Sequence, residues 1–99
     1  MPRVALDRTL KRAMISVELY GVPRLRAGVA QVSLEADTLA GALRGLGRVC
    51  PDLVGTVLVE GRVHPAYKLS RNGDAFIDDP DTILRSGDAL LLLSADVGG

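Results

Sequence analysis

The sequence has few of the residues that build redox, metal or membrane sites. Among its 99 residues there is one cysteine, Cys50, and one histidine, His64. One cysteine cannot close an intramolecular disulfide, and the pair cannot supply the ligands of a Cys/His zinc site. No apolar run approaches the roughly 18 residues of a membrane span, and the N-terminus lacks the apolar core of a signal peptide. We expect a cytoplasmic protein with no metal site and no membrane partner.

Excess charge of one sign is also missing from the chain as a whole. Twelve basic and twelve acidic side chains cancel at pH 7, so no global field attracts nucleic acid. Residues 1–13 nevertheless carry four basic side chains against one acidic side chain. We interpret residues 1–13 as a basic N-terminal extension, either frayed and without a role or an arm that docks on a partner.

Alternating apolar residues predict a first β-hairpin. Residues 14–20 and 29–35 both alternate with the period of a half-buried strand, and the Gly- and Pro-containing residues 21–28 between them are typical of a connection. The side chains expected to face inward are Ile15, Val17, Leu19, Ala30, Val32 and Leu34. Tyr20 then falls on the opposite face.

The apolar period changes to that of a helix after residue 37. The expected buried face comprises Leu39, Ala42, Leu43, Leu46, Val49 and Cys50. Asp37 or Thr38 is placed to cap the N-terminus, and Pro51 ends the helix near Cys50. Residues 52–61 fit either a short strand or an irregular apolar segment under the helix.

The last third of the chain predicts a second hairpin and a final strand. Asn72-Gly73 indicates a tight turn within residues 64–77, and residues 78–88 are rich in turn formers around Ile83-Leu84, which we expect to be buried. The continuous apolar run at 89–95 is typical of a central strand. One helix on one face of a mixed sheet, with the first and last strands adjacent, defines an α+β architecture of the β-grasp, or ubiquitin-like, type.

Several of these segments together resemble the ubiquitin-like sulfur carriers, which include the molybdopterin synthase small subunit and the thiamine-biosynthesis sulfur carrier. The resemblance rests on "ISVELYG", "DTLAGALRGL", "RNGDAFI", "LRSGDALLLL" and the terminal "GG". It implies a β-grasp domain over residues 14–95 and a flexible tail over 96–99. It also implies a protein cosubstrate rather than an enzyme, either alone or as the small subunit of a synthase complex.

The resemblance further implies the chemistry of the tail. An E1-like adenylyltransferase would use ATP to adenylate the Gly99 carboxylate, and a cysteine desulfurase or rhodanese-like donor would convert it to a thiocarboxylate. The acceptor would be a synthase subunit, first of all in molybdenum- or tungsten-cofactor synthesis or a related sulfur metabolite, and the carrier itself would bind no cofactor. Glycine suits this role because Gly98 and Gly99 have no Cβ to clash in a narrow channel.

Alternation on the last strand predicts a docking surface. If Leu90 and Leu92 face the helix, Leu91 and Leu93 face outward with Tyr20, flanked by Ser70 and Lys68. Exposed apolar patches of this kind mark partner sites. Alternatively, residues 52–63 or the N-terminal arm cover this face.

Two other functions fit the same sequence. A ubiquitin-like modifier shares the adenylation step but ends on target lysines, and the chain's own lysines are Lys11 and Lys68. A non-covalent β-grasp interaction module would make no chemical use of its tail.

Overall fold

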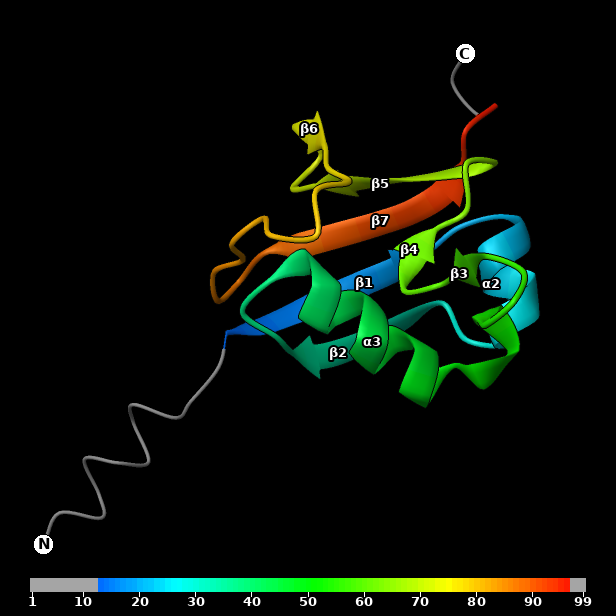
Figure 1. The fold of residues 1–99 in the computed structure, drawn as a ribbon, viewed down its shortest axis with the longest axis horizontal. Helices are drawn as coiled ribbons and strands as arrows, with labels where there is room; N and C mark the ends of the chain where they lie inside the picture. The colour runs from blue at the N-terminus through cyan, green and yellow to red at the C-terminus, as the bar shows by residue number, and fades with distance from the viewer. Residues whose placement is uncertain (1–12, 97–99) are drawn as a thin grey trace, which may run out of the picture.

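Five strands form a mixed sheet in the order β2-β1-β7-β5-β6 (Figure 1). The computed structural model describes residues 13–96, so all of the predicted basic extension except Ala13, and the Gly98-Gly99 pair, lie outside the described residues. Strand β7 (Ala89–Ser94) pairs in parallel with β1 (Met14–Leu19) and antiparallel with β5 (Tyr67–Arg71). The predicted adjacency of the first and last strands is therefore confirmed.

The first hairpin is confirmed, with one exposed residue at its edge. Strand β1 pairs antiparallel with β2 (Gln31–Glu35), and its inward side chains are buried as the alternation predicts. Ala30 is exposed, contrary to expectation, because β2 begins one residue later. Its carbonyl still accepts a hydrogen bond from the Leu19 N–H at 2.8 Å, which closes the hairpin.

The connection between β1 and β2 contains a short helix that the sequence analysis missed. Helix α2 (Val22–Ala27) has Pro23 in its first turn, where a fixed φ and a missing N–H cost nothing. Gly28 ends the helix in the left-handed region at φ 80°, and its N–H donates to the Arg24 carbonyl at 2.9 Å. Glycine and proline here act as helix caps rather than as loop formers.

Helix α3 (Leu39–Val49) packs on one face of the sheet, as predicted. Thr38 is the N-cap, and its Oγ1 accepts from the Gly41 N–H at 3.2 Å. The expected burial of Val49 is wrong, since this side chain is 55% exposed. The chain turns at Cys50 into η1 (Pro51–Leu53), and Cys50 and Leu53 fill the core at this end of the helix instead.

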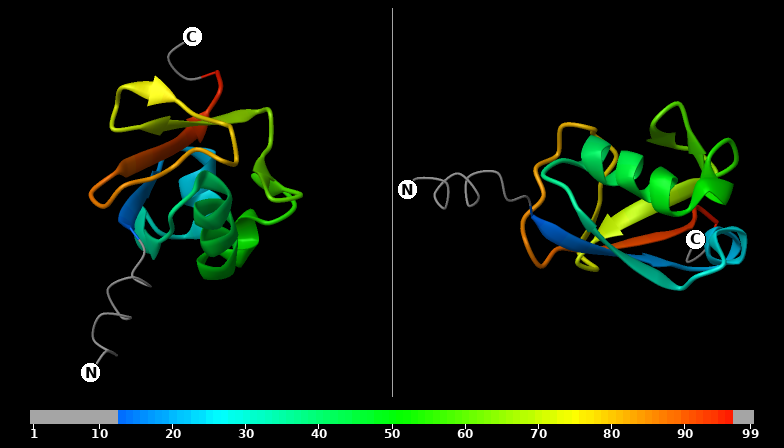
Figure 2. Two further views of the ribbon diagram at one scale, coloured as in Figure 1. Left: turned by 60° about the vertical axis from the view of Figure 1, so that its left-hand side comes forward. Right: turned by 90° about the horizontal axis from the view of Figure 1, so that it is seen from below.

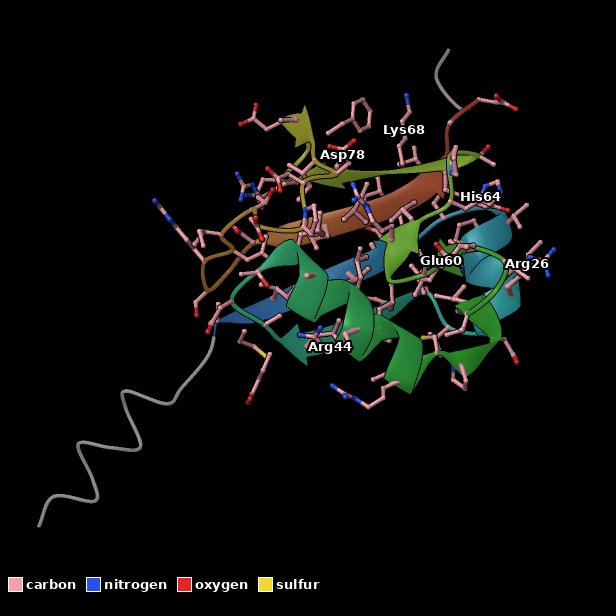
Figure 3. All side chains as sticks on the ribbon, in the orientation of Figure 1. Arg26, Arg44, Glu60, His64, Lys68 and Asp78 are labelled. Carbon is pink, nitrogen blue, oxygen red and sulfur yellow. The ribbon has the colours of Figure 1, made fainter. Side chains whose placement is uncertain are left out.

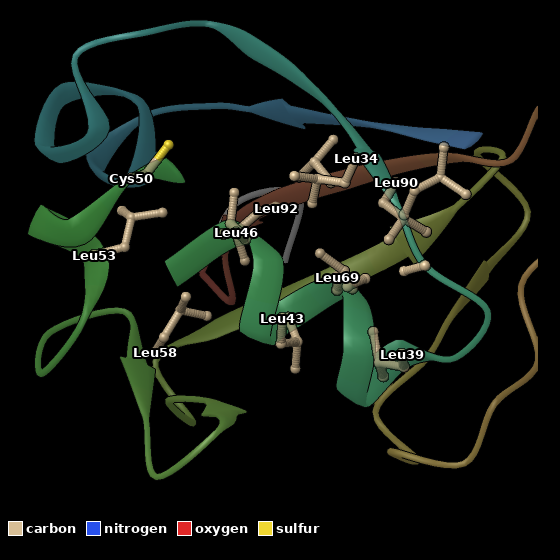
Figure 4. Packing of buried hydrophobic residues seen from close by; sticks show 14 of the residues in the cluster. Leu34, Leu39, Leu43, Leu46, Cys50, Leu53, Leu58, Leu69, Leu90 and Leu92 are labelled. Atoms are coloured by element: carbon tan, nitrogen blue, oxygen red, sulfur yellow. The ribbon is translucent and has the colours of Figure 1, made fainter. Parts of the chain in front are cut away.

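Residues 52–63 combine the two alternatives predicted for 52–61, because an irregular apolar stretch beside the helix is followed by short strands outside the main sheet. They contain β3 (Leu58–Val59) and β4 (Arg62–Val63), which make a separate two-stranded sheet. Leu53, Val57 and Leu58 are buried. Figure 4 shows Leu53 and Leu58 beside the helical leucines, so this segment extends the core on the helix side.

The second hairpin joins β5 to β6 (Ala75–Phe76) through the predicted turn. Asn72 and Gly73 have φ values of 56° and 67°, the left-handed backbone that this residue pair adopts readily. In residues 78–88 the expected burial holds for Leu84, which is 4% exposed, and fails for Ile83, which is 64% exposed. The two are neighbours in extended backbone, so their side chains point to opposite sides.

The core lies between α3 and the inner face of the sheet (Figure 4). Its largest side chains are aliphatic and come from β1, β7, β5, α3 and η1. Within residues 13–96, no helix has the length and apolarity to cross a bilayer.

Candidate functional site

The side chains on the two faces of strand β7 differ in how far the rest of the protein buries them. Leu90 and Leu92 are 2% and 0% exposed and point into the core. Leu91 and Leu93 point to the other face and are half-buried. Figure 2 shows that α3 and the residues 52–63 lie on the inner side of the sheet, so neither of these elements covers the outer face. The alternative in which residues 52–63 cover it is wrong.

Register brings the predicted docking residues together on this outer face. Leu93 is the cross-strand partner of Lys68, and Leu91 is the partner of Ser70. Tyr20 follows β1, and its N–H donates to the Leu92 carbonyl at 3.0 Å. Its side chain is 53% exposed and opposite in direction to the buried Leu19. Their role in partner binding stays a prediction.

Phe76 joins this group, and the sequence analysis missed it. It is the cross-strand partner of Ser70 and is 60% exposed. The Lys68 Nζ lies 4.3 Å from the centre of the Phe76 ring, a cation–π contact. The loop between β5 and β6 has three residues, 72–74, whereas a two-residue turn at Asn72-Gly73 would have paired Phe76 with Leu69 on the inner face, so the turn signal alone does not place Phe76. We define the outer patch as Tyr20, Lys68, Ser70, Phe76, Leu91 and Leu93.

The outer patch contains a shallow hollow of about 220 Å³. Turn residues 73–75 and four members of the patch line it, namely Ser70, Phe76, Leu91 and Leu93. Ser70 is 9% exposed, so it forms part of the floor and not an exposed flank. The hollow is mostly apolar and suits an apolar side chain of a protein partner.

The other half of the outer face is polar. Glu18 lies beside Leu91 on β1, and its partner on β2 is Gln31. Ser16 and Ser33 form the next pair along the same two strands. Apolar outward side chains are therefore concentrated toward β5, β6 and the carboxyl end of β7.

The carboxyl end of β7 forms the root of the tail. Tyr67 pairs with Ser94, and the Ala95 N–H donates to the Ala66 carbonyl at 2.8 Å. Asp96, the last described residue, is exposed. The predicted reactive residues Gly98 and Gly99 lie outside the described residues, so the tail root is defined here by residues 94–96.

Away from the outer patch, the pKa values of Cys50 and Asp88 are shifted by burial and by hydrogen bonds that belong to the fold. Burial raises the pKa of the Cys50 thiol, which makes the unreactive protonated form more stable. Asp88 stands before β7, at the opposite end from the tail root. The Arg85 N–H, 2.9 Å from its carboxylate, and then the Asn72 side chain and the charge of Arg71 hold its pKa below the usual range. Within residues 13–96, no group of three or more His, Cys, Asp or Glu could hold a metal ion.

The fold is similar to several solved structures. The small archaeal modifier protein SAMP1 from Haloferax volcanii is 24% identical with a TM-score of 0.75, covering 88% of this chain and 100% of that one. A chain of the Amycolatopsis orientalis BexX/CysO complex is 20% identical with a TM-score of 0.70, covering 86% and 99%. A Pyrococcus furiosus protein assigned as molybdopterin converting factor subunit 1 is 16% identical with a TM-score of 0.64, covering 83% and 97%.

These comparisons confirm the predicted β-grasp fold. At such identities the likeness establishes the fold and not the activity. No protein-family model and no curated protein sequence matches the chain.

Proposed function

We propose that the protein is a sulfur carrier that uses the Gly99 carboxylate as its acyl group. The observation that carries this proposal is the position of the tail root. The central strand β7 ends beside the outer patch, so a partner that docks on the patch lies next to the tail root. Gly98 and Gly99 come two and three residues after Asp96 in the sequence.

Reach and shape support this arrangement. Residues 95–99 would span at most about 17 Å when fully extended, enough to enter an active site in a partner docked on the outer patch. Glycines without Cβ atoms narrow the last part of that segment. The body would then serve as the docking surface and the tail as the substrate.

The chemical steps would be catalysed by partner proteins. A Gly99 carboxylate oxygen attacks the α-phosphorus of ATP on an E1-like enzyme, and pyrophosphate leaves. The persulfide of a sulfur donor then displaces AMP to form an acyl disulfide. A thiol cleaves that S–S bond, which releases the thiocarboxylate and leaves a disulfide between the thiol and the donor, and the thiocarboxylate passes its sulfur to an acceptor. This chain supplies the acyl group and the docking surface, and the E1-like partner binds the ATP.

Molybdenum- or tungsten-cofactor synthesis is the destination we rank first. Similarity to the Pyrococcus furiosus molybdopterin converting factor subunit supports it. The acceptor would be a synthase subunit whose active site receives the thiocarboxylate. Similarity to a chain of a BexX/CysO complex supports a protein partner more generally.

A ubiquitin-like modifier is the second candidate, and similarity to the archaeal modifier protein favours it. The activated Gly99 would then form an amide with a lysine of a target protein. A ladder of products that survives denaturant, captured through a tag at the N-terminus, would support conjugation. Absence of such a ladder in cells that contain the E1-like enzyme would count against conjugation and would leave sulfur transfer as the remaining candidate function.

Intact mass spectrometry tests the proposal. Purified protein is incubated with the E1-like enzyme of the same organism, ATP and a sulfur donor, and a gain equal to the replacement of one oxygen by sulfur is expected. The matched control has one residue added after Gly99 and should remain unmodified. An unmodified wild-type protein would contradict the carrier function, and full biological activity of the extended variant would favour the non-covalent interaction module.

A further inference from the structure

Strand β2 forms a free edge of the main sheet. It pairs with β1 on one side, and within residues 13–96 no strand pairs with its other side. Two hydrogen bonds fix the phase of the β1–β2 ladder. The Leu19 N–H donates to the Ala30 carbonyl at 2.8 Å, and the Ala36 N–H donates to the Ala13 carbonyl at 2.9 Å. Along an antiparallel strand, residues that bond the neighbouring strand alternate with residues that do not.

The alternation directs three consecutive sets of backbone groups away from β1. Even-numbered residues from 30 to 36 bond β1, so the N–H and C=O groups of Gln31, Ser33 and Glu35 point to the free side. Outside the ladder, no backbone hydrogen bond within residues 13–96 involves these groups. The side chains of the three residues are exposed. The right-hand view of Figure 2 shows β2 in the foreground, with no other described helix or strand over its free edge.

This edge lacks the features that keep natural edge strands from pairing. The register with β1 runs without a bulge along the strand, and β2 contains no proline, glycine or lysine. Its one charged side chain, Glu35, is at its last position. The opposite edge of the sheet, β6, has two residues and is protected by its shortness. Strand β2 is therefore the edge of this sheet that can accept another strand.

The sequence of β2 fits a second copy of itself. An antiparallel pair with a two-fold axis at Ser33 uses every outward backbone group of both strands. It places Gln31 opposite Glu35 of the second copy, where the amide can donate to the carboxylate. On the inner face, Val32 lies beside Leu34 of the second copy, so the apolar layer continues across the pair. Moving the axis to Glu35 would instead set two carboxylates opposite each other, which is unfavourable.

We propose that the protein forms a two-fold dimer in which the β2 strands of two copies pair antiparallel and join the two five-stranded sheets into one. The outer patch and the tail root stay accessible in this dimer, because β1 separates β2 from β7, and β5 and β6 lie beyond β7. Figure 3 shows Lys68, a member of the outer patch, on the opposite side of the molecule from β2. The dimer goes beyond the proposed carrier function and does not depend on it.

Analytical ultracentrifugation of the purified protein tests the dimer. The wild type should pass from monomer to dimer as its concentration rises from about 1 μM to about 1 mM, the range of small transient interfaces. Ser33→Lys sets two ammonium groups opposite each other and should raise the dissociation constant about fivefold. Ser16→Lys adds the same charge to the outer face of β1, away from the edge, and should stay within about twofold of the wild type. A wild type that remains monomeric at about 1 mM, or a Ser33→Lys variant that dimerises as tightly, overturns the proposal.

Cysteine cross-linking tests the register separately. In the proposed dimer the two residues at position 33 form a bonded pair, with Cα atoms about 5.5 Å apart, which is within the range of a disulfide. Ser33→Cys should therefore give a covalent dimer on mild oxidation, and Ser16→Cys, the matched control, should remain uncrosslinked. Cys50 is buried in the core and does not compete. A protein that dimerises while Ser33→Cys cross-links no faster than Ser16→Cys would overturn the assignment of the interface to β2.

Discussion

The inner and outer faces of β7 carry the same residue type and have different surroundings. Leu90 and Leu92 are closed off by α3 and the core, at 2% and 0% exposure. Leu91 and Leu93, one residue away, line a hollow on the face that no described element covers. A continuous apolar strand can therefore serve folding on one face and recognition on the other, and the comparison of the two faces separates these roles.

The largest expected effect comes from removing a side chain on the inner face. Leu92→Ala should lower the free energy of unfolding by about 2–5 kcal/mol, because it leaves a cavity in a filled core. Leu93→Ala, the matched change on the outer face, should cost less than about 1 kcal/mol. Urea denaturation measures both. Equal losses in the two variants would contradict the division between the faces.

A smaller effect is expected where α3 begins to cover the inner face. Thr38→Ala removes the acceptor of the Gly41 N–H and should lower the free energy of unfolding by about 1 kcal/mol. Thr38→Ser keeps the hydroxyl and should stay close to the wild type. Both are compared by thermal and urea unfolding, and an Ala variant as stable as the Ser variant would show that the cap contributes nothing.

The smallest effect concerns the contacts that set the register of β7. The Asn72 side chain bonds the Asp88 carboxylate and the Ala89 N–H, and a slip of one residue would exchange the two faces. The pKa of Asp88 is lower when the protein is folded than when it is unfolded. Its charged form therefore stabilises the fold above the unfolded pKa, and that contribution is lost as pH falls through the folded pKa.

Asp88→Asn should accordingly reduce stability near neutral pH and flatten the decline that begins as pH falls below about 4, the unfolded pKa, and continues through the lower folded pKa. Urea unfolding at a series of pH values measures this slope. Asp74→Asn is the control, since Asp74 is exposed in the adjacent turn. A slope in Asp88→Asn that equals the wild-type slope would show that Asp88 does not carry the acid dependence.

Much of the fold follows from sequence because its signals are local. The alternation in β1, the helical period before Pro51 and the Asn72-Gly73 turn each predict the element that forms. Helix α2 was missed because Gly21, Pro23 and Gly28 occur in caps as well as in loops. The exposure of Val49 depends on the path of the chain after the helix, which its own periodicity does not contain.

The candidate site was predictable where alternation alone decides it. Tyr20 follows from the alternation in β1, whereas Leu91 and Leu93 face outward only on the condition that Leu90 and Leu92 face the helix, because an unbroken run of leucines does not itself fix which of them point inward. Phe76 needed the register across the turn, and the burial of Ser70 needed the side chains around it. The anchoring of the tail root could not be predicted, because the Ala66 carbonyl and the Ala95 N–H are brought together only by the pairing of β5 with β7.

The most direct test of the two-face account adds one charge to the outer patch. Leu93→Glu should keep its urea midpoint close to the wild type yet lose at least about tenfold in the rate of thiocarboxylate formation, as expected when a central docking side chain is lost. Gln31→Glu adds the same charge to the polar half of that face and should stay within about twofold of the wild-type rate. A folded Leu93→Glu protein that is converted as fast as the wild type would contradict the account.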